Sequence, residues 1–146
     1  MTGHRVPWAN KTHVFMSYSR VDGKSIVSKL EADLNANGIS TWSDRLIRPG
    51  VPFGDELERA INNSFAMLAL ITSGACKSHW IRGEWCYAIS RGDVTIIPVV
   101  APGFPEDSFP IELIPISRIY LAEEYDSSLE DIISFLNFAR ENPPIW

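Results

Sequence analysis

Residues 65–72 of this chain, FAMLALIT, decide its fold. Seven apolar residues follow one another before Thr72, whereas a strand with one solvent-facing side would alternate apolar and polar residues. A strand with two apolar faces lies in the middle of a parallel sheet, where helices cover it on both sides. The stretch therefore predicts the central strand of an α/β protein.

Short apolar runs and helical segments alternate on both sides of this stretch. The other strands are predicted at residues 13–17, 39–43, 93–100 and 116–121. Helical spacing of apolar residues predicts helices at residues 21–37, 55–63, 78–91 and 127–140, and residues 101–115 form a Pro-rich irregular stretch. The alternation predicts an α/β fold, a flavodoxin-like three-layer sandwich with a five-stranded parallel sheet of order 2-1-3-4-5 and helices on both faces.

The composition is that of one globular domain of 146 residues, with 45% hydrophobic residues and a net charge of −5. Without a long basic run or a bilayer-length apolar run, we expect no nucleic acid partner and no membrane partner. Two cysteines, no metal-ligand spacing and no signal-peptide core predict reduced thiols, no metal site and a cytoplasmic location. We expect the domain at residues 13–141, an N-terminal tail at residues 1–12 and a C-terminal tail at residues 142–146.

The sheet order predicts one crevice for ligands, where the carboxyl ends of the first and third strands diverge. Residues 17–20 end the first strand, residues 72–74 end the third, and Ser78 caps the helix that comes next. Trp80 and Glu84 lie four residues apart on one face of this helix, which places an aromatic wall beside a carboxylate.

Three segments, taken in order and with their spacing, resemble Toll/interleukin-1 receptor (TIR) domains. Residues 14–19, VFMSYS, look like the first box of the family, and Arg48-Pro49-Gly50 resembles the second box, on what the family calls the BB loop. Residues 78–84 resemble the start of the helix after the third strand. The resemblance covers residues 13–140 and is closest to stand-alone bacterial TIR proteins, although the third box has no clear equivalent.

The resemblance implies cleavage of the N-glycosidic bond of NAD⁺. Many bacterial, plant and neuronal TIR domains release nicotinamide from NAD⁺ and form ADP-ribose or a cyclic isomer. Glu84 matches the essential carboxylate of these enzymes. Positions that contact the nucleotide in the family match Ser19, Arg20, Asp44 and Phe53.

The residues of this chain suit that chemistry. Nicotinamide in NAD⁺ is already a cationic leaving group, so the barrier lies in the positive charge that grows on the ribose, which Glu84 can stabilise. Trp80 and Phe53 offer π faces to the cationic ring, and Arg20 and Arg48 can bind the diphosphate. We expect no metal and no bound cofactor, because NAD⁺ is the substrate.

Each candidate residue also has a plainer interpretation. Glu84 can be a solvated helix residue and Trp80 a partly buried wall residue. Arg20 can pair with Asp22, and Asp44 can cap its own loop. The whole domain can also be a non-catalytic TIR module, which self-associates or mimics a host adaptor.

Single positions in the sequence exclude a nucleotide-binding P-loop and a phospho-receiver domain. Gly23-Lys24-Ser25 resembles the end of a phosphate-binding P-loop, but Tyr18 stands where that loop needs glycine. A phospho-receiver domain needs an aspartate at the end of its third strand, and this chain has Ile71-Thr72-Ser73 there.

The resemblance further implies that activity depends on assembly. We expect self-association through the BB loop, from Asp44 to Phe53, contacts with other TIR-containing proteins, and weak activity of the isolated chain. Bacterial anti-phage immunity is the expected setting, and virulence is the alternative. Hydrolysis and cyclisation of the NAD⁺ substrate both remain open.

Overall fold

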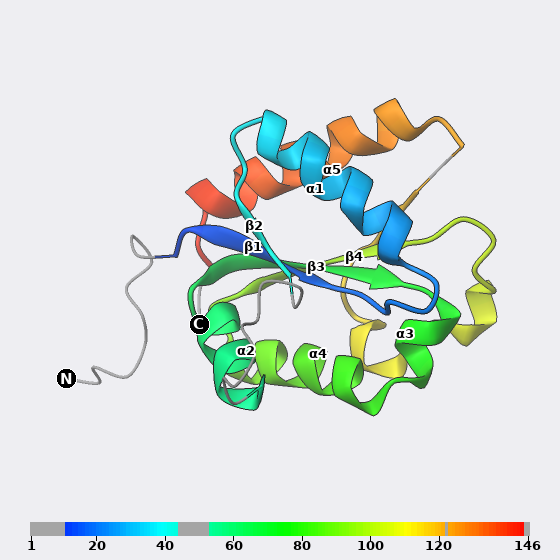
Figure 1. Cartoon of the computed structure of the whole chain (residues 1–146), viewed down its shortest axis with the longest axis horizontal. Coiled ribbons are helices and arrows are strands. Elements are labelled where there is room, and N and C mark those ends of the chain that lie inside the picture. The colour runs from blue at the N-terminus through cyan, green and yellow to red at the C-terminus, as the bar shows by residue number, and fades with distance from the viewer. Residues whose placement is uncertain (1–10, 44–52, 122, 145–146) are drawn as a thin grey trace.

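The computed structural model describes residues 11–43, 53–121 and 123–144. The strands are β1 (His13–Ser17), β2 (Thr41–Trp42), β3 (Ser64–Ile71), β4 (Thr95–Val100) and β5 (Ile119–Tyr120). The helices are α1 (Lys24–Ala36), α2 (Phe53–Asn62), α3 (Ser73–Lys77), α4 (His79–Arg91) and α5 (Tyr125–Glu141), with 3₁₀ turns at Glu106–Ser108 and Ile111–Leu113. The strands pair in parallel in the order β2-β1-β3-β4-β5, which confirms the predicted flavodoxin-like α/β fold (Figure 1).

Strand β3 lies at the centre of the sheet, and all of its residues are buried. On one side Met67 pairs with Phe15 of β1, and on the other Leu68 pairs with Ile97 of β4. Burying a large apolar side chain stabilises a fold by about 1.5–3 kcal/mol. The strand therefore stabilises the domain through both of its faces, as its unbroken apolar sequence predicts.

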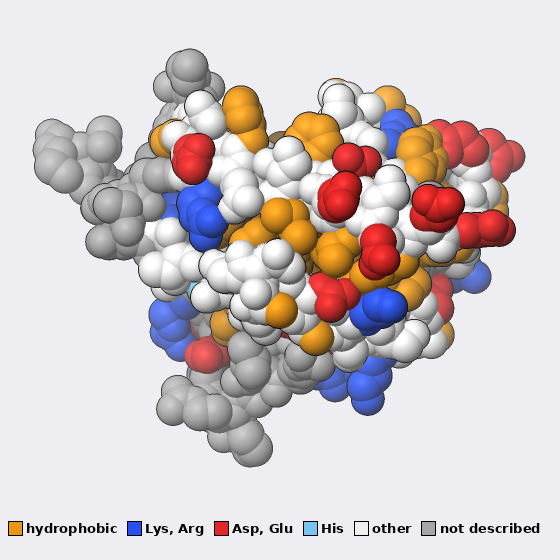
Figure 2. Space-filling model, turned by 90° about the horizontal axis from the view of Figure 1, so that it is seen from above, with side chains coloured by type: hydrophobic (Ala, Val, Ile, Leu, Met, Phe, Trp, Pro, Cys, Tyr) orange, Lys and Arg blue, Asp and Glu red, His pale blue; other side chains and the backbone are white. Residues whose placement is uncertain are grey.

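The two faces of the sheet carry separate hydrophobic cores. Helices α1 and α5 cover one face, and α2, α3 and α4 cover the other (Figure 1). Because successive strand residues point to opposite faces, Leu68 packs in the core under α1 and α5, whereas Met67 packs with Trp85 of α4. Figure 2 shows the α1/α5 face, on which apolar side chains run across the middle and acidic side chains gather beside them.

Several element boundaries differ from those predicted. The edge strands β2 and β5 have two residues each, shorter than the predicted residues 39–43 and 116–121. Helix α2 begins at Phe53, inside the predicted loop, and helix α3 was not predicted. Helix α3 escaped prediction because its sequence, SGACK, is too short to show apolar periodicity. Within the described ranges, no helix is both long enough and apolar enough to span a bilayer.

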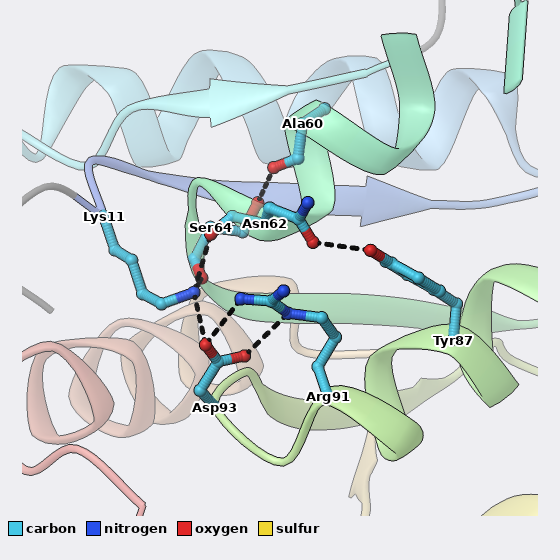
Figure 3. A network of polar contacts seen from close by, with 7 residues as sticks. All are labelled: Lys11, Ala60, Asn62, Ser64, Tyr87, Arg91 and Asp93. Atoms are coloured by element: carbon cyan, nitrogen blue, oxygen red, sulfur yellow. Dashed lines mark hydrogen bonds and ion pairs between the residues drawn. The ribbon is translucent and has the colours of Figure 1, made fainter. Parts of the chain in front are cut away.

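A buried ion cluster joins the segment before β1 to the segment before β4, at the amino ends of the strands and opposite the predicted crevice (Figure 3). Lys11 Nζ lies 3.4 Å from Asp93 Oδ2 and donates to the carbonyl of Asn62 at 2.7 Å. Arg91 donates to both oxygens of the same carboxylate, at 3.1 and 2.8 Å. Burial lowers the pKa of Lys11, and the charge of Asp93 opposes that shift. Lys11, placed by the sequence in the N-terminal tail, is thus packed against the domain.

Replacing Asp93 with asparagine should destabilise the domain, because the Lys11 ammonium would remain buried without its counter-ion. We expect a loss of about 3–5 kcal/mol in the free energy of unfolding, measured by urea denaturation. The matched control is Asp131→Asn, an exposed carboxylate on α5, which should change stability by less than about 0.5 kcal/mol. Equal midpoints for the two variants would contradict a stabilising role of the ion cluster.

Candidate active site

Glu84 lies in the second turn of α4, and its side chain is turned toward the sheet. The helix begins after Ser78, whose hydroxyl accepts the backbone N–H of Ile81 at 3.1 Å, as the predicted cap requires. Glu84 is 9% exposed, and its Oε1 accepts a hydrogen bond of 2.7 Å from the hydroxyl of Ser17. The interpretation of Glu84 as a solvated helix residue is therefore wrong.

The partner hydroxyl belongs to the last residue of β1. Ser17 Oγ also accepts a hydrogen bond of 3.1 Å from the indole Nε1–H of Trp85, which is fully buried. Glu84 is thus linked to the sheet and to the core of the α2/α4 side at once. Neither Ser17 nor Trp85 was among the predicted site residues, because no local pattern shows which side chains meet across the sheet.

A pocket of about 240 Å³ opens between α2 and α4, which lie on the same face of the sheet (Figure 1). Glu84 lines it together with Trp80, which is 49% exposed, and buried Leu57 and Ile61 supply apolar surface from α2. The full lining is Gly54, Leu57, Glu58, Ile61, His79, Trp80, Gly83, Glu84 and Tyr87. This α2–α4 pocket combines an aromatic wall, apolar surface and a fixed carboxylate, a combination typical of ligand sites.

Two polar contacts hold the helices around this pocket. The Tyr87 hydroxyl donates to Asn62 Oδ1 at 2.8 Å, which ties α4 to the last residue of α2. Arg82 donates from Nε and Nη2 to the Glu112 carboxylate, and from Nη1 to the carbonyl of Cys76. Burial raises the pKa of Glu112, but the hydrogen bond and charge of Arg82 outweigh burial and leave that pKa lowered. Helix α4 is therefore fixed on both sides.

A second set of hydrogen bonds connects the loop after β1 with the end of β3. Asp22 Oδ1 accepts from the Thr72 hydroxyl and Oδ2 from the backbone N–H of Gly74, each at 2.8 Å. Thr72 also caps α3 by accepting the N–H of Ala75 at 3.1 Å. We call Asp22, Thr72 and Gly74 the loop clasp. It explains why the ends of the first and third strands stay together.

A match between the sequence and a family model identifies the family of this chain. A family model described as "TIR domain" matches residues 14–133, which include β1 except His13, the α2–α4 pocket and the first half of α5. This chain belongs to the TIR domain family. The resemblance inferred from three short segments therefore holds over most of the sequence.

Relatives of this TIR domain include a curated protein of Magallana gigas named stimulator of interferon genes protein. The two are 25% identical over 130 residues, which are 86% of this chain but 31% of the relative. The chain thus spans about a third of the length of that relative.

Solved structures show the same fold. The TIR-STING receptor of C. gigas in complex with 2′,3′-cGAMP matches with a TM-score of 0.73 and 24% identity, over 92% of this chain and 41% of the receptor. The TIR domains of the activated Roq1 resistosome, which recognises the pathogen effector XopQ, match with a TM-score of 0.71 and 18% identity. This match covers 85% of this chain and 98% of the Roq1 chain. The TIR domain of the Toll-related receptor TRR-2 of Hydra magnipapillata matches with a TM-score of 0.69 and 21% identity, over 88% of this chain and 98% of the TRR-2 chain.

The structure brings two of the predicted site residues of this TIR domain, Trp80 and Glu84, into one pocket. Ser19 is buried, and its hydroxyl accepts the N–H of Val21 at 3.2 Å. Arg20 is exposed and lines a different hollow beside α1, so neither Ser19 nor Arg20 lines the α2–α4 pocket.

The remaining predicted residues belong to the BB loop. Asp44 and Arg48 lie outside the described residues, and Phe53 is described only as the first residue of α2, next to Gly54 in the pocket wall. The alternative pairing of Arg20 with Asp22 competes with the loop clasp, which already engages both Asp22 oxygens. Among the described side chains, no three His, Cys, Asp or Glu residues gather as metal ligands.

Replacing Gly74 with alanine should weaken the loop clasp. A Cβ at this position would lie 2.6 Å from Asp22 Oδ1 and 2.8 Å from Ser19 Oγ, so both side chains would have to move. We expect the variant to lose about 1–3 kcal/mol of unfolding free energy in urea denaturation. Gly83→Ala is the control, since a Cβ there meets nothing within 4 Å and alanine favours the helix by about 0.5–1 kcal/mol. Stabilisation of both variants would show that the clasp adapts freely.

Proposed function

We propose that this TIR domain cleaves the bond between nicotinamide and ribose in NAD⁺, with Glu84 as the essential carboxylate. The observation that carries the proposal is the buried, hydrogen-bonded carboxylate of Glu84 in the same pocket as the half-exposed ring of Trp80. A carboxylate is rarely buried without a functional or structural reason, because its desolvation costs several kcal/mol. Membership of the TIR family supports the proposal further.

The chemistry needs one fixed negative charge and little else. As the C1′–N bond of NAD⁺ breaks, its electron pair moves to the ring nitrogen, and nicotinamide leaves as a neutral molecule. Positive charge then develops on the ribose, where the carboxylate of Glu84 stabilises the oxocarbenium-like transition state. Water that attacks C1′ and loses a proton gives ADP-ribose, whereas attack by an atom of the same nucleotide gives a cyclic isomer.

The size of the pocket suggests which part of NAD⁺ enters it. About 240 Å³ is less than the 300–1,000 Å³ typical of pockets that enclose a whole ligand, but suits a single ring with part of a sugar. We place the nicotinamide ring against Trp80, whose π face attracts a cation. The ADP half then lies outside the pocket, where Ser19, Arg20, Asp44, Arg48 and Phe53 are the proposed contacts. No metal and no bound cofactor are part of this proposal.

A non-catalytic interaction module is the second candidate function. Helix α5 exposes Phe135 and Phe138, which are 56% and 65% accessible, and also carries the exposed acidic residues Glu130 and Asp131. Exposed aromatic side chains of this kind are typical of interaction surfaces. Such a module would self-associate or bind other TIR-containing proteins without consuming NAD⁺.

The proposed setting is defence against pathogens, and in bacteria defence against phage. One relative is named a stimulator of interferon genes, and one similar structure is a resistosome that recognises a pathogen effector. Both names support an immune role for the proposed cytoplasmic enzyme.

Substitution of Glu84 tests the enzyme directly. We expect Glu84→Ala and Glu84→Gln to lower nicotinamide release from NAD⁺ by about 10²-fold or more, measured by chromatography, because both remove the negative charge. Glu84→Gln retains an oxygen that can accept from Ser17, so circular dichroism and urea denaturation should show a folded protein. Glu130→Gln, on the opposite face of the sheet, is the charge-matched control. Release that survives both substitutions would exclude Glu84 as the catalytic group.

Assembly should control the rate. We propose that the BB loop of one copy completes the site of another, so turnover per chain should rise with protein concentration and with a crowding agent. The measurement is nicotinamide release per chain from nanomolar to micromolar protein, with light scattering to follow the oligomeric state. A high and constant turnover across this range would contradict assembly dependence. An inert chain under crowded conditions would favour the interaction module.

A further inference from the structure

The hydroxyl of Ser17 lies between two other buried polar groups, and the chemistry of these groups fixes its orientation. Trp85 Nε1 is 3.1 Å from Ser17 Oγ, and that oxygen is 2.7 Å from Glu84 Oε1. An indole N–H can only donate, so Ser17 Oγ must accept from Trp85. The single hydroxyl proton of Ser17 is then directed at Glu84. The result is a hydrogen-bond chain with one direction, from Trp85 through Ser17 to Glu84.

Burial strengthens this chain. Ser17 is 1% exposed and Trp85 is fully buried, so water does not compete for either group. Hydrogen bonds in series polarise one another in a medium of low dielectric constant, and a bond to a carboxylate is assisted by its charge. A donor directed at a carboxylate favours its ionised form, which is the form that can stabilise a developing cation.

The hydrogen-bond chain is anchored in the buried centre of the domain. Ser17 is paired with Ala69 of the central strand β3, and Trp85 packs in the core with Phe15 and Met67. A glutamate side chain on a helix has several rotatable bonds, and the contact with Ser17 selects one arrangement among them. The sheet, rather than the helix surface, therefore determines where Glu84 Oε1 lies.

We propose that Ser17 is a positioning residue for NAD⁺ cleavage, which holds the Glu84 carboxylate in place and is itself oriented by Trp85. The inference rests on the proposed function of Glu84. The competing interpretation is that Ser17 only satisfies buried polar groups and stabilises the fold. The two interpretations differ in what the loss of the Ser17 hydroxyl does to kcat and to its pH dependence.

The titration of Glu84 has to be distinguished from that of the other titratable side chains in its pocket. Glu58 of α2 and His79 and Tyr87 of α4 line the same pocket. Glu58→Gln and His79→Gln therefore accompany the experiment, so that a change in the pH profile can be assigned to Glu84.

The test compares Ser17→Ala, Ser17→Thr and Trp85→Phe in steady-state NAD⁺ cleavage between pH 4 and 9. We expect Ser17→Ala to lower kcat about 10- to 100-fold with little change in KM, because a misplaced group loses transition-state stabilisation. The acidic limb of its kcat profile should move to higher pH. Ser17→Thr keeps the hydroxyl and should restore both quantities. Trp85→Phe removes the N–H and should shift the limb in the same direction by a smaller amount.

Ser64→Ala is the matched control. Ser64 is a fully buried serine whose hydroxyl donates to the carbonyl of Ala60 at 2.6 Å, at the opposite end of the sheet. Its loss should lower the urea midpoint as Ser17→Ala does, but leave kcat and the acidic limb of the folded enzyme unchanged. If Ser17→Ala behaves like Ser64→Ala, Ser17 is only a structural residue and the inference is overturned.

A second measurement does not depend on turnover. The ¹H–¹⁵N signal of the Trp85 indole, assigned by its absence in Trp85→Phe, should titrate at acidic pH in the wild type, because the chain transmits the ionisation of Glu84. This titration should disappear in Ser17→Ala and in Glu84→Gln, and persist in Ser64→Ala. A Trp85 signal that is insensitive to both substitutions overturns the hydrogen-bond chain. A transmitted titration in a protein that releases no nicotinamide would keep the chain and reject the proposed function.

Discussion

Because β3 is buried on both faces, the helices of this domain must form two layers, and the position of the α2–α4 pocket follows from that division. In this parallel sheet the strand order reverses between β1 and β3, and the helices that follow these two strands, α1 and α4, pack in the cores on opposite faces. Helix α4 starts shortly after β3 ends and returns along the sheet toward β4. Its second turn therefore passes the end of β1, which is where Ser17 meets Glu84.

The packing of α4 explains how a carboxylate comes to be buried there. Trp85 has to enter the core, since a fully buried indole contributes more apolar area than any neighbour on the helix. Glu84 precedes it by one position and is carried toward the sheet by the same rotation of the helix. The cost of removing the charge from water is offset in part by the Ser17 hydroxyl. Core packing and site geometry thus depend on one pair of adjacent residues.

The sequence was sufficient for those features that depend on local patterns. The unbroken apolar stretch of β3 predicted the sheet, and Ser78 predicted the start of α4. The contact between Ser17 and Glu84 joins residues 67 positions apart, so no periodicity or spacing could reveal it. The burial of Lys11 escaped prediction for the same reason, since its carboxylate partner Asp93 lies 82 positions further along the sequence. The BB-loop residues Asp44 and Arg48 stay predictions.

The shortness of the two edge strands has a consequence for a protein that is proposed to work at high local concentration. An exposed strand with a long row of unpaired backbone groups invites pairing with another chain and irreversible aggregation. β2 and β5 offer two residues each, and beside β5 the guanidinium of Arg118 lies over the ring of Phe109 at 3.4 Å. The short edge strands therefore leave little of the described sheet open to backbone pairing between copies of this domain.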